Sequence, residues 1–142
     1  MVGAERTTGR ELIASYLASF AEGRPDAVVA HVTEDFVNEH LGVLARGCEG
    51  KETYRGRLAG FLEGFQNLRY EPIEIVADGS AGAARYCMRF TQSGKDFEIN
   101  GVMWFKISNG LISKRTDCWD GLVYLQQAGA GADEIAGMLG GR

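Results

Sequence analysis

The chain has 142 residues, a length typical of one domain with a single hydrophobic core. Its 15 basic and 19 acidic residues are mixed along the sequence without a basic block, which argues against nucleic acid or an anionic membrane surface as a partner. No apolar run approaches membrane-spanning length, and three widely spaced cysteines suit neither a disulfide framework nor a zinc site. We therefore expect one cytoplasmic domain over residues 1–142, without a metal ion.

Helix patterns dominate the first half of the chain. Apolar residues recur every three or four positions from Leu12 to Phe20, and a capping box, Thr8-x-x-Glu11, precedes them. A short helix is predicted after Pro25, and a third has its apolar face between Tyr54 and Phe65.

Strand patterns follow. Residues 35–40 alternate in polarity, so that Phe36, Asn38 and His40 share one side. Four more strands are predicted between residues 67 and 120, three of them joined by hairpin turns. Pro72 in the first of these strands indicates that the strand lies at an edge of the sheet or contains a bulge. A weak terminal helix is predicted after residue 125. This order predicts an α+β fold in which a curved, mainly antiparallel sheet wraps around N-terminal helices.

A carboxylate stands in the middle of the last predicted strand. Arg115, Asp117 and Trp119 share one face there, because side chains alternate along a strand. An acid beside an aromatic residue is costly to bury unless it is paired or has a chemical role. Asp117 is therefore predicted to be either a catalytic acid or base, or the partner of an arginine in an ion pair.

The strand phases also predict a pocket wall and an outer face. On the wall we place Arg85 and Cys87 of one strand and Phe97, Ile99 and Met103 of the next. The opposite phase of the first strand remains possible from the sequence, because both faces are largely apolar. With the chosen phase the outer face of the sheet is apolar, and its residues are Tyr86, Met88, Phe90, Val102 and Trp104. Such a face predicts a homodimer formed through the sheet.

One stretch carries a family resemblance. GKDFEINGVMWFKISNGLISKRTDCWD combines a Gly-Lys turn, an apolar strand, an Asn-Gly turn and a strand with two aspartates three residues apart. With the first helix and Thr33-Glu34-Asp35-Phe36 it resembles the SnoaL-like branch of the nuclear transport factor 2-like superfamily, which includes polyketide cyclases and limonene-1,2-epoxide hydrolases. The resemblance implies a cone-shaped α+β barrel with a deep apolar pocket, commonly dimeric.

The resemblance also implies an activity. It suggests a cofactor-independent acid/base enzyme of the cyclase or isomerase type, acting on an apolar polyketide-, steroid- or terpenoid-like molecule. Its catalytic residues would be Asp117, Arg85 and His40. The substrate would contact Asn38, Cys87, Phe97, Ile99, Met103, Arg115 and Trp119.

Three alternatives stay open. An epoxide hydrolase is one, although Cys87 stands where those enzymes place a second aspartate, and Asn38 and His40 replace the tyrosine and asparagine that position water. A non-catalytic binding protein for an apolar ligand is another. The third is a protein-interaction scaffold whose cavity is filled by side chains.

Overall fold

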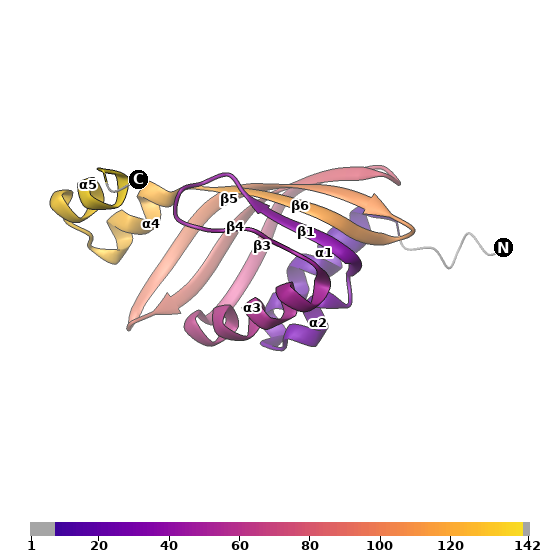
Figure 1. Cartoon of the computed structure of the whole chain (residues 1–142), viewed down its shortest axis with the longest axis horizontal. Coiled ribbons are helices and arrows are strands. Elements are labelled where there is room, and N and C mark those ends of the chain that lie inside the picture. The colour runs from indigo at the N-terminus through magenta and orange to yellow at the C-terminus, as the bar shows by residue number, and fades with distance from the viewer. Residues whose placement is uncertain (1–7, 141–142) are drawn as a thin grey trace.

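The computed structural model describes residues 8–140 and confirms the α+β fold (Figure 1). One six-stranded sheet has the strand order β2-β1-β6-β5-β4-β3. All neighbouring strands are antiparallel except β1 and β6, which run parallel. The elements in chain order are α1 (Gly9–Ser19), the 3-10 helix η2 (Phe20–Glu22), α2 (Pro25–Val29), β1 (Val32–His40), β2 (Cys48–Glu49), α3 (Lys51–Gly64), β3 (Gln66–Ala77), β4 (Ala81–Gln92), β5 (Lys95–Ser108), β6 (Leu111–Trp119), α4 (Gly121–Ala128) and α5 (Ala132–Gly140).

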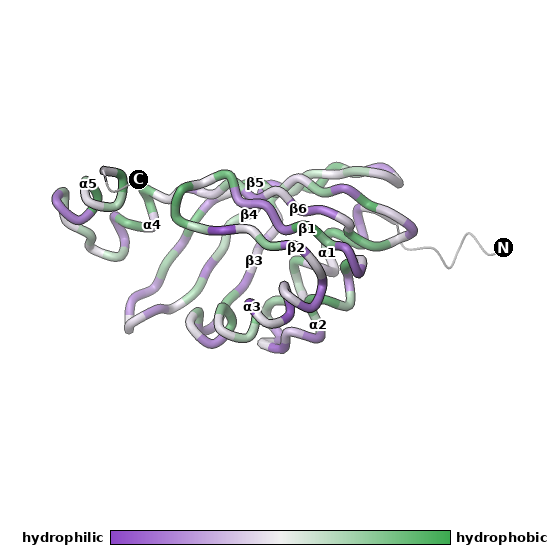
Figure 2. The backbone as a smooth tube through the Cα atoms, viewed as in Figure 1, coloured by the Kyte–Doolittle hydropathy of each residue, from purple (hydrophilic) through white to green (hydrophobic). Residues whose placement is uncertain are grey.

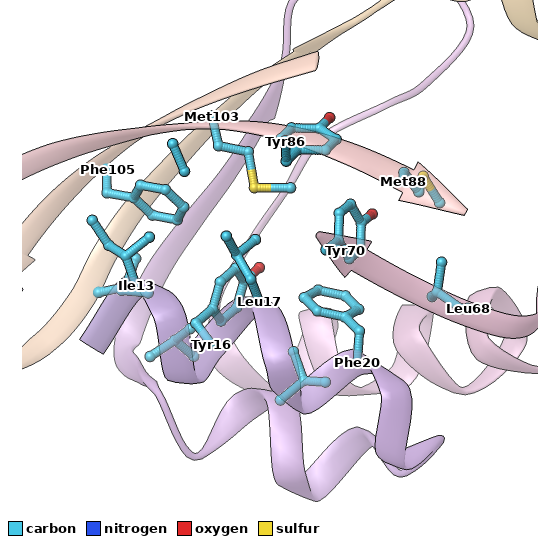
Figure 3. Packing of buried hydrophobic residues seen from close by; sticks show 14 of the residues in the cluster. Ile13, Tyr16, Leu17, Phe20, Leu68, Tyr70, Tyr86, Met88, Met103 and Phe105 are labelled. Atoms are coloured by element: carbon cyan, nitrogen blue, oxygen red, sulfur yellow. The ribbon is translucent and has the colours of Figure 1, made fainter. Parts of the chain in front are cut away.

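Helix α1 begins and packs as its sequence predicts. The Thr8 hydroxyl accepts a hydrogen bond from the Glu11 amide, and the Glu11 carboxylate accepts one from the Thr8 amide. The apolar stripe of α1 then lies against the inner face of the sheet. Figure 3 shows Ile13 and Tyr16 facing Phe105 and Met103, and Phe20 of η2 next to Tyr70.

Two tight turns set the register of β4, β5 and β6. In Ser93-Gly94 and in Asn109-Gly110 both turn residues have positive φ, as two-residue hairpin turns of type I′ require. The first turn pairs Gln92 with Lys95, so every even-numbered residue of β4 lies opposite an odd-numbered residue of β5.

This register shows that the predicted phase of β4 was wrong. Tyr86 lies opposite Gly101 and Met88 opposite Ile99, and directly paired residues point to the same face. Tyr86 and Met88 are therefore inside, whereas Arg85 is exposed on the outer face. Cys87 belongs to that outer face too, although it is only 6 % exposed.

The outer face is accordingly less apolar than predicted. Tyr86, Met88 and Phe90 all belong to the hydrophobic core. Val102 and Trp104 remain outside, with about half of their surface exposed. β3 lies at the edge of the sheet, and its pairing with β4 shifts register at Pro72. The proline therefore lies both on an edge strand and at an irregularity of the ladder, the two positions predicted for it.

Helices cover the sheet unevenly (Figure 1). α1, α2 and α3 lie below its inner face, while α4 and α5 extend beyond one end. Within residues 8–140, no helix has the length and apolar character that crossing a membrane would require.

Candidate functional site

A cavity of about 450 Å³ opens between the inner face of the sheet, α3 and α4. Its volume lies within the range typical of small-molecule sites. Most of the wall is apolar and includes Leu58, Phe61, Met88, Ile99, Trp119 and Leu125. The interior is therefore open rather than filled by side chains, and a scaffold with a packed interior does not fit this structure.

Six of the predicted site residues line this cavity: Asn38, His40, Ile99, Arg115, Asp117 and Trp119. The parallel pairing of β1 with β6 brings the polar ones together, because Asn38 lies beside Arg115 and His40 beside Asp117. Since these strands stand at opposite ends of the chain, only the sheet order makes the four residues neighbours.

Four predicted site residues do not line the cavity. Arg85 and Cys87 point to the other face of the sheet, for the reason given by the β4 register. Met103 lies opposite Asp117 on the inner face but is fully covered by the core. Phe97 stacks on the lining residue Phe90 with ring centroids 4.8 Å apart, without reaching the cavity itself.

Asp117 presents two different oxygens to its surroundings. The residue is only 3 % exposed, and its Oδ1 accepts a hydrogen bond from the Tyr86 hydroxyl at 2.6 Å. Oδ2 lies 3.9 Å from Nη2 of Arg115 and 3.9 Å from Nδ1 of His40. Both distances exceed that of a hydrogen bond. Oδ2 is thus the oxygen left for a ligand by the described residues.

Gly101 explains how Tyr86 on β4 reaches Asp117 on β6. Tyr86 pairs with Gly101 on the intervening strand β5. A Cβ atom at position 101 would collide with the tyrosine hydroxyl and lie 2.6 Å from its ring carbon Cζ. The missing side chain therefore lets the ring lie across β5. The sequence contains this signal, since a glycine interrupts an otherwise bulky strand.

Arg115 organises the polar end of the cavity. Each of its three nitrogens donates to the protein: Nε to Asn38 Oδ1 at 3.0 Å, Nη1 to the Tyr16 hydroxyl at 3.0 Å and Nη2 to His40 Nε2 at 3.3 Å. Burial opposes its charge, but Tyr16, Tyr54 and Asp117 outweigh that effect and hold the pKa of Arg115 well above its usual value. The guanidinium therefore stays charged at this buried position.

His40 is neutral at physiological pH. Burial, followed by the charge of Arg115, lowers its pKa from 6.5 to about 4, although Asp117 acts in the opposite direction. Because a guanidinium can only donate, Nε2 must accept and the ring proton sits on Nδ1. Within residues 8–140, Nδ1 is buried without a hydrogen-bond partner.

Two tyrosines flank Asp117, and neither was predicted from the sequence to belong to the site. The rings of Tyr70 and Tyr86 lie 5.2 Å apart, and Tyr70 lines the cavity. Burial, followed by the negative charge of Asp117, raises the pKa of both hydroxyls. Both tyrosines therefore remain protonated donors across the ordinary pH range.

The mouth of the cavity has a different character. Exposed Arg46 and Arg57 line it, and Arg57 Nη1 donates to the carbonyl oxygens of Arg46 and Gly47. The loop between β1 and β2 also carries exposed Leu41 and Val43 and is coloured hydrophobic over much of its length in Figure 2. In the described part of the chain, no group of three or more His, Cys, Asp or Glu side chains could hold a metal ion.

Solved structures share this fold at low sequence identity. A protein of ketosteroid isomerase-like fold from Catenulispora acidiphila, in complex with trimethylamine, is 16 % identical with a TM-score of 0.78, over 87 % of this chain and 95 % of that one. A candidate polyketide cyclase from Pseudomonas putida is 21 % identical with a TM-score of 0.75, over 84 % and 97 %. A candidate SnoaL-like polyketide cyclase from Shewanella denitrificans is 14 % identical with a TM-score of 0.75, over 85 % and 96 %.

At these identities the neighbours establish the fold alone. No curated protein matches the chain. The family model of the SnoaL-like domain, however, matches residues 13–115, which run from within α1 to the middle of β6 and include the polar residues Asn38, His40 and Arg115. The chain therefore belongs to the SnoaL-like domain family.

Proposed function

We propose that the protein is a cofactor-independent enzyme that moves protons on an apolar small molecule, with Asp117 as the general acid and base. The observation that supports this proposal is the hydrogen bonding of the two Asp117 carboxylate oxygens. One oxygen is held by Tyr86, while the other has no hydrogen bond from the described residues, and the side chain lines a largely apolar cavity. A base held in place by one hydrogen bond, with its second oxygen free of hydrogen bonds in a largely apolar cavity, is suited to proton transfer.

The chemistry would use Asp117 twice. Oδ2 takes a proton from a carbon next to a carbonyl group, and the C–H electron pair forms an enolate. The resulting carboxylic acid then returns the proton to a different atom in an isomerisation, or protonates the oxygen formed when the enolate closes a ring. A positioned general base contributes about 10²- to 10⁴-fold, so the apolar walls must supply further rate by orienting the substrate.

The walls and the mouth define the ligand we expect. The apolar interior favours a polyketide-, steroid- or terpenoid-like skeleton. Arg46 and Arg57 line the cavity at its exposed end and have no acidic partner among residues 8–140. We therefore expect the substrate to carry an anionic group, such as a carboxylate, at the end that faces solvent.

One alternative activity has less support. Epoxide hydrolysis of the limonene-epoxide type depends on a second carboxylate, and Asp117 is the one acidic residue among the described residues that line the cavity. A binding protein without catalysis is the second candidate. It is favoured by the buried pair of Asp117 and Arg115, since such a pair can serve a structural role alone.

The substitution Asp117→Asn separates these two candidates. It retains the shape of the side chain and removes the group that exchanges protons. For any substrate found in a screen of cyclic ketones and acidic polyketides, the enzyme proposal predicts near-complete loss of turnover with affinity largely retained. Asp35→Asn, at an exposed position of β1, is the matched control and should leave turnover unchanged. Undiminished turnover in Asp117→Asn would remove Asp117 from the mechanism.

A further inference from the structure

Helix α5 differs from the other α-helices because it buries none of its residues. Each of α1, α2, α3 and α4 has at least one buried residue. In α5 the apolar residues Ile135, Met138 and Leu139 recur at helical spacing, yet Met138 and Leu139 are about half exposed. A helix of 9 residues is too short to be stable in water by itself, so its apolar side needs a surface to pack on.

The neighbouring helix α4 is firmly attached to the sheet. The Tyr124 hydroxyl donates to Oε1 of Gln92 at 2.7 Å. The side-chain amide of Gln127 pairs with both backbone groups of Glu98, since it donates to the carbonyl oxygen and accepts from the amide, each at 3.0 Å. α4 is therefore a fixed wall of the cavity.

No such attachment holds α5. At its start the Gly131 amide donates to Oε1 of Glu134, and the Gly131 carbonyl accepts from the Ile135 amide. No hydrogen bond or ion pair joins α5 to the described residues of any other element. Two of the three residues that link it to α4 are glycines, and Gly129 has a φ of +82°. A short linker of this kind can act as a hinge.

The mouth of the cavity lies next to α5. Met138 lines the cavity although it is partly exposed, and Leu44 of the loop between β1 and β2 lines it as well. A Cβ atom at Gly121 would lie 3.1 Å from Cδ1 of Leu44, so this loop and the start of α4 are in contact. Figure 1 shows α5 at the end of the molecule where α4 and this loop lie. α5 therefore borders the mouth through Met138.

The charges of α5 favour this mouth over a lipid surface as the partner of its apolar side. The helix carries Asp133 and Glu134 but no basic residue. Helices that lie on membranes are rich in lysine and arginine on their polar side. The mouth, in contrast, has the positive charges of Arg46 and Arg57.

We propose that α5 is a hinged cover of the cavity, which turns about the linker from Gly129 to Gly131 and packs Met138 and Leu139 onto an apolar ligand. The ligand supplies the surface that the apolar side of α5 lacks. This inference rests on the proposed function only for the presence of an apolar ligand in the cavity, and it concerns access rather than chemistry. Closure would exclude water from Asp117.

Hydrogen–deuterium exchange followed by mass spectrometry tests the motion in the full chain. The probe is 8-anilinonaphthalene-1-sulfonate, whose rings suit the apolar walls and whose sulfonate suits the arginines at the mouth. Without the probe, we expect the amides of α5 to exchange nearly as fast as in an unstructured peptide and those of α4 to be protected. A saturating concentration of the probe should slow exchange in α5 about tenfold or more. Equal protection of both helices without the probe, no change in α5 on binding, or no binding of the probe would overturn the proposal.

Binding kinetics then test the contacts of the closed state. The double substitution Met138→Ala with Leu139→Ala removes apolar side chains that are exposed without ligand, so it should leave the fold intact. By stopped-flow fluorescence, it should raise the dissociation rate constant of the probe about tenfold and change the association rate constant less than twofold. Gly137→Ala, on the other side of α5, is the matched control and should not accelerate dissociation. Equal dissociation from the double variant and the wild type would overturn the proposal.

Neither measurement involves turnover. Asp117→Asn should show the same protection of α5 by the probe as the wild type does. A failure of the cover and a failure of the proposed function are therefore distinguishable.

Discussion

At the scale of single residues, the site depends on a contact that glycine permits. Tyr86 crosses β5 over Gly101 and fixes one oxygen of Asp117. Its hydroxyl donates to a charged acceptor in a buried position, which makes the bond one of the stronger hydrogen bonds in proteins. The orientation of the acid is therefore set two strands away from its own.

Gly101→Ala should destabilise the protein. The added methyl group collides with the Tyr86 ring, and overpacking of this kind costs about 1–3 kcal/mol. Tyr86→Phe should cost about 1.5–3 kcal/mol through the lost hydrogen bond to Asp117. Urea denaturation of both variants and of the double variant is the measurement. Because the two residues are in contact, the double variant should lose less than the sum of the single losses; strict additivity would show that they are not coupled.

His40 predicts a specific pH dependence of stability. Its pKa is about 4 in the folded protein and near 6.5 in the unfolded chain. Between these values the unfolded state binds more protons, so the free energy of unfolding falls as the pH drops from 6.5 to 4. The loss amounts to about 3 kcal/mol. His40→Leu should remove this part of the slope in urea titrations, and equal slopes in both proteins would contradict the assignment.

At the scale of elements, β4 shows how much a single turn determines. The two-residue turn Ser93-Gly94 pairs even residues of β4 with odd residues of β5. With Ile99 and Met103 inside, Tyr86 and Met88 must be inside as well. The prediction for this strand was wrong because it followed the chemistry of its arginines and its cysteine rather than the register that the turn imposes.

Other parts of the site were not accessible to local patterns. The helices, the hairpins and the burial of Asp117 follow from periodicity and turn residues. His40 and Asp117 lie side by side because β1 and β6 pair in parallel. The cover that α4 provides depends on packing of Tyr124 and Leu125 at the cavity. Long-range strand pairing and helix docking of this kind leave no local pattern in a single sequence.

Helix α3 offers a test of stability at the same scale. Gly56 and Gly60 lie in its interior and are exposed, and a methyl group added at either position would meet open space. Glycine in a helix interior costs roughly 0.5–1 kcal/mol relative to alanine. Gly56→Ala and Gly60→Ala should each raise the free energy of unfolding by that amount, in contrast to Gly101→Ala. A loss of stability in urea denaturation would mean that these positions have contacts absent from the structure.

At the scale of the whole molecule, the outer face of the sheet remains apolar in places. Val76, Val102 and Trp104 are each about half exposed, and Val76 and Trp104 flank Ala83 across neighbouring strands. We propose that a second copy covers this face in a homodimer, since such a patch is unfavourable in water.

Sedimentation analysis tests this assembly. The wild-type protein should sediment at twice the monomer mass at micromolar concentration. Trp104→Lys places a charge in the centre of the patch and should yield a monomer, whereas Arg85→Lys on the same face should remain dimeric. A monomeric wild-type protein would contradict the proposal.

We propose that Asp117 removes protons from carbon inside the cavity. This step is tested most directly by hydrogen–deuterium exchange at the α-carbon of 2-tetralone, an apolar enolisable ketone, followed by NMR in D₂O. The wild-type protein should accelerate exchange above the buffer rate. Asp117→Asn should reduce the protein-dependent rate by about 10²-fold or more, and Asp35→Asn should leave it unchanged. Equal rates for wild type and Asp117→Asn, or no acceleration by the wild type, would contradict the account.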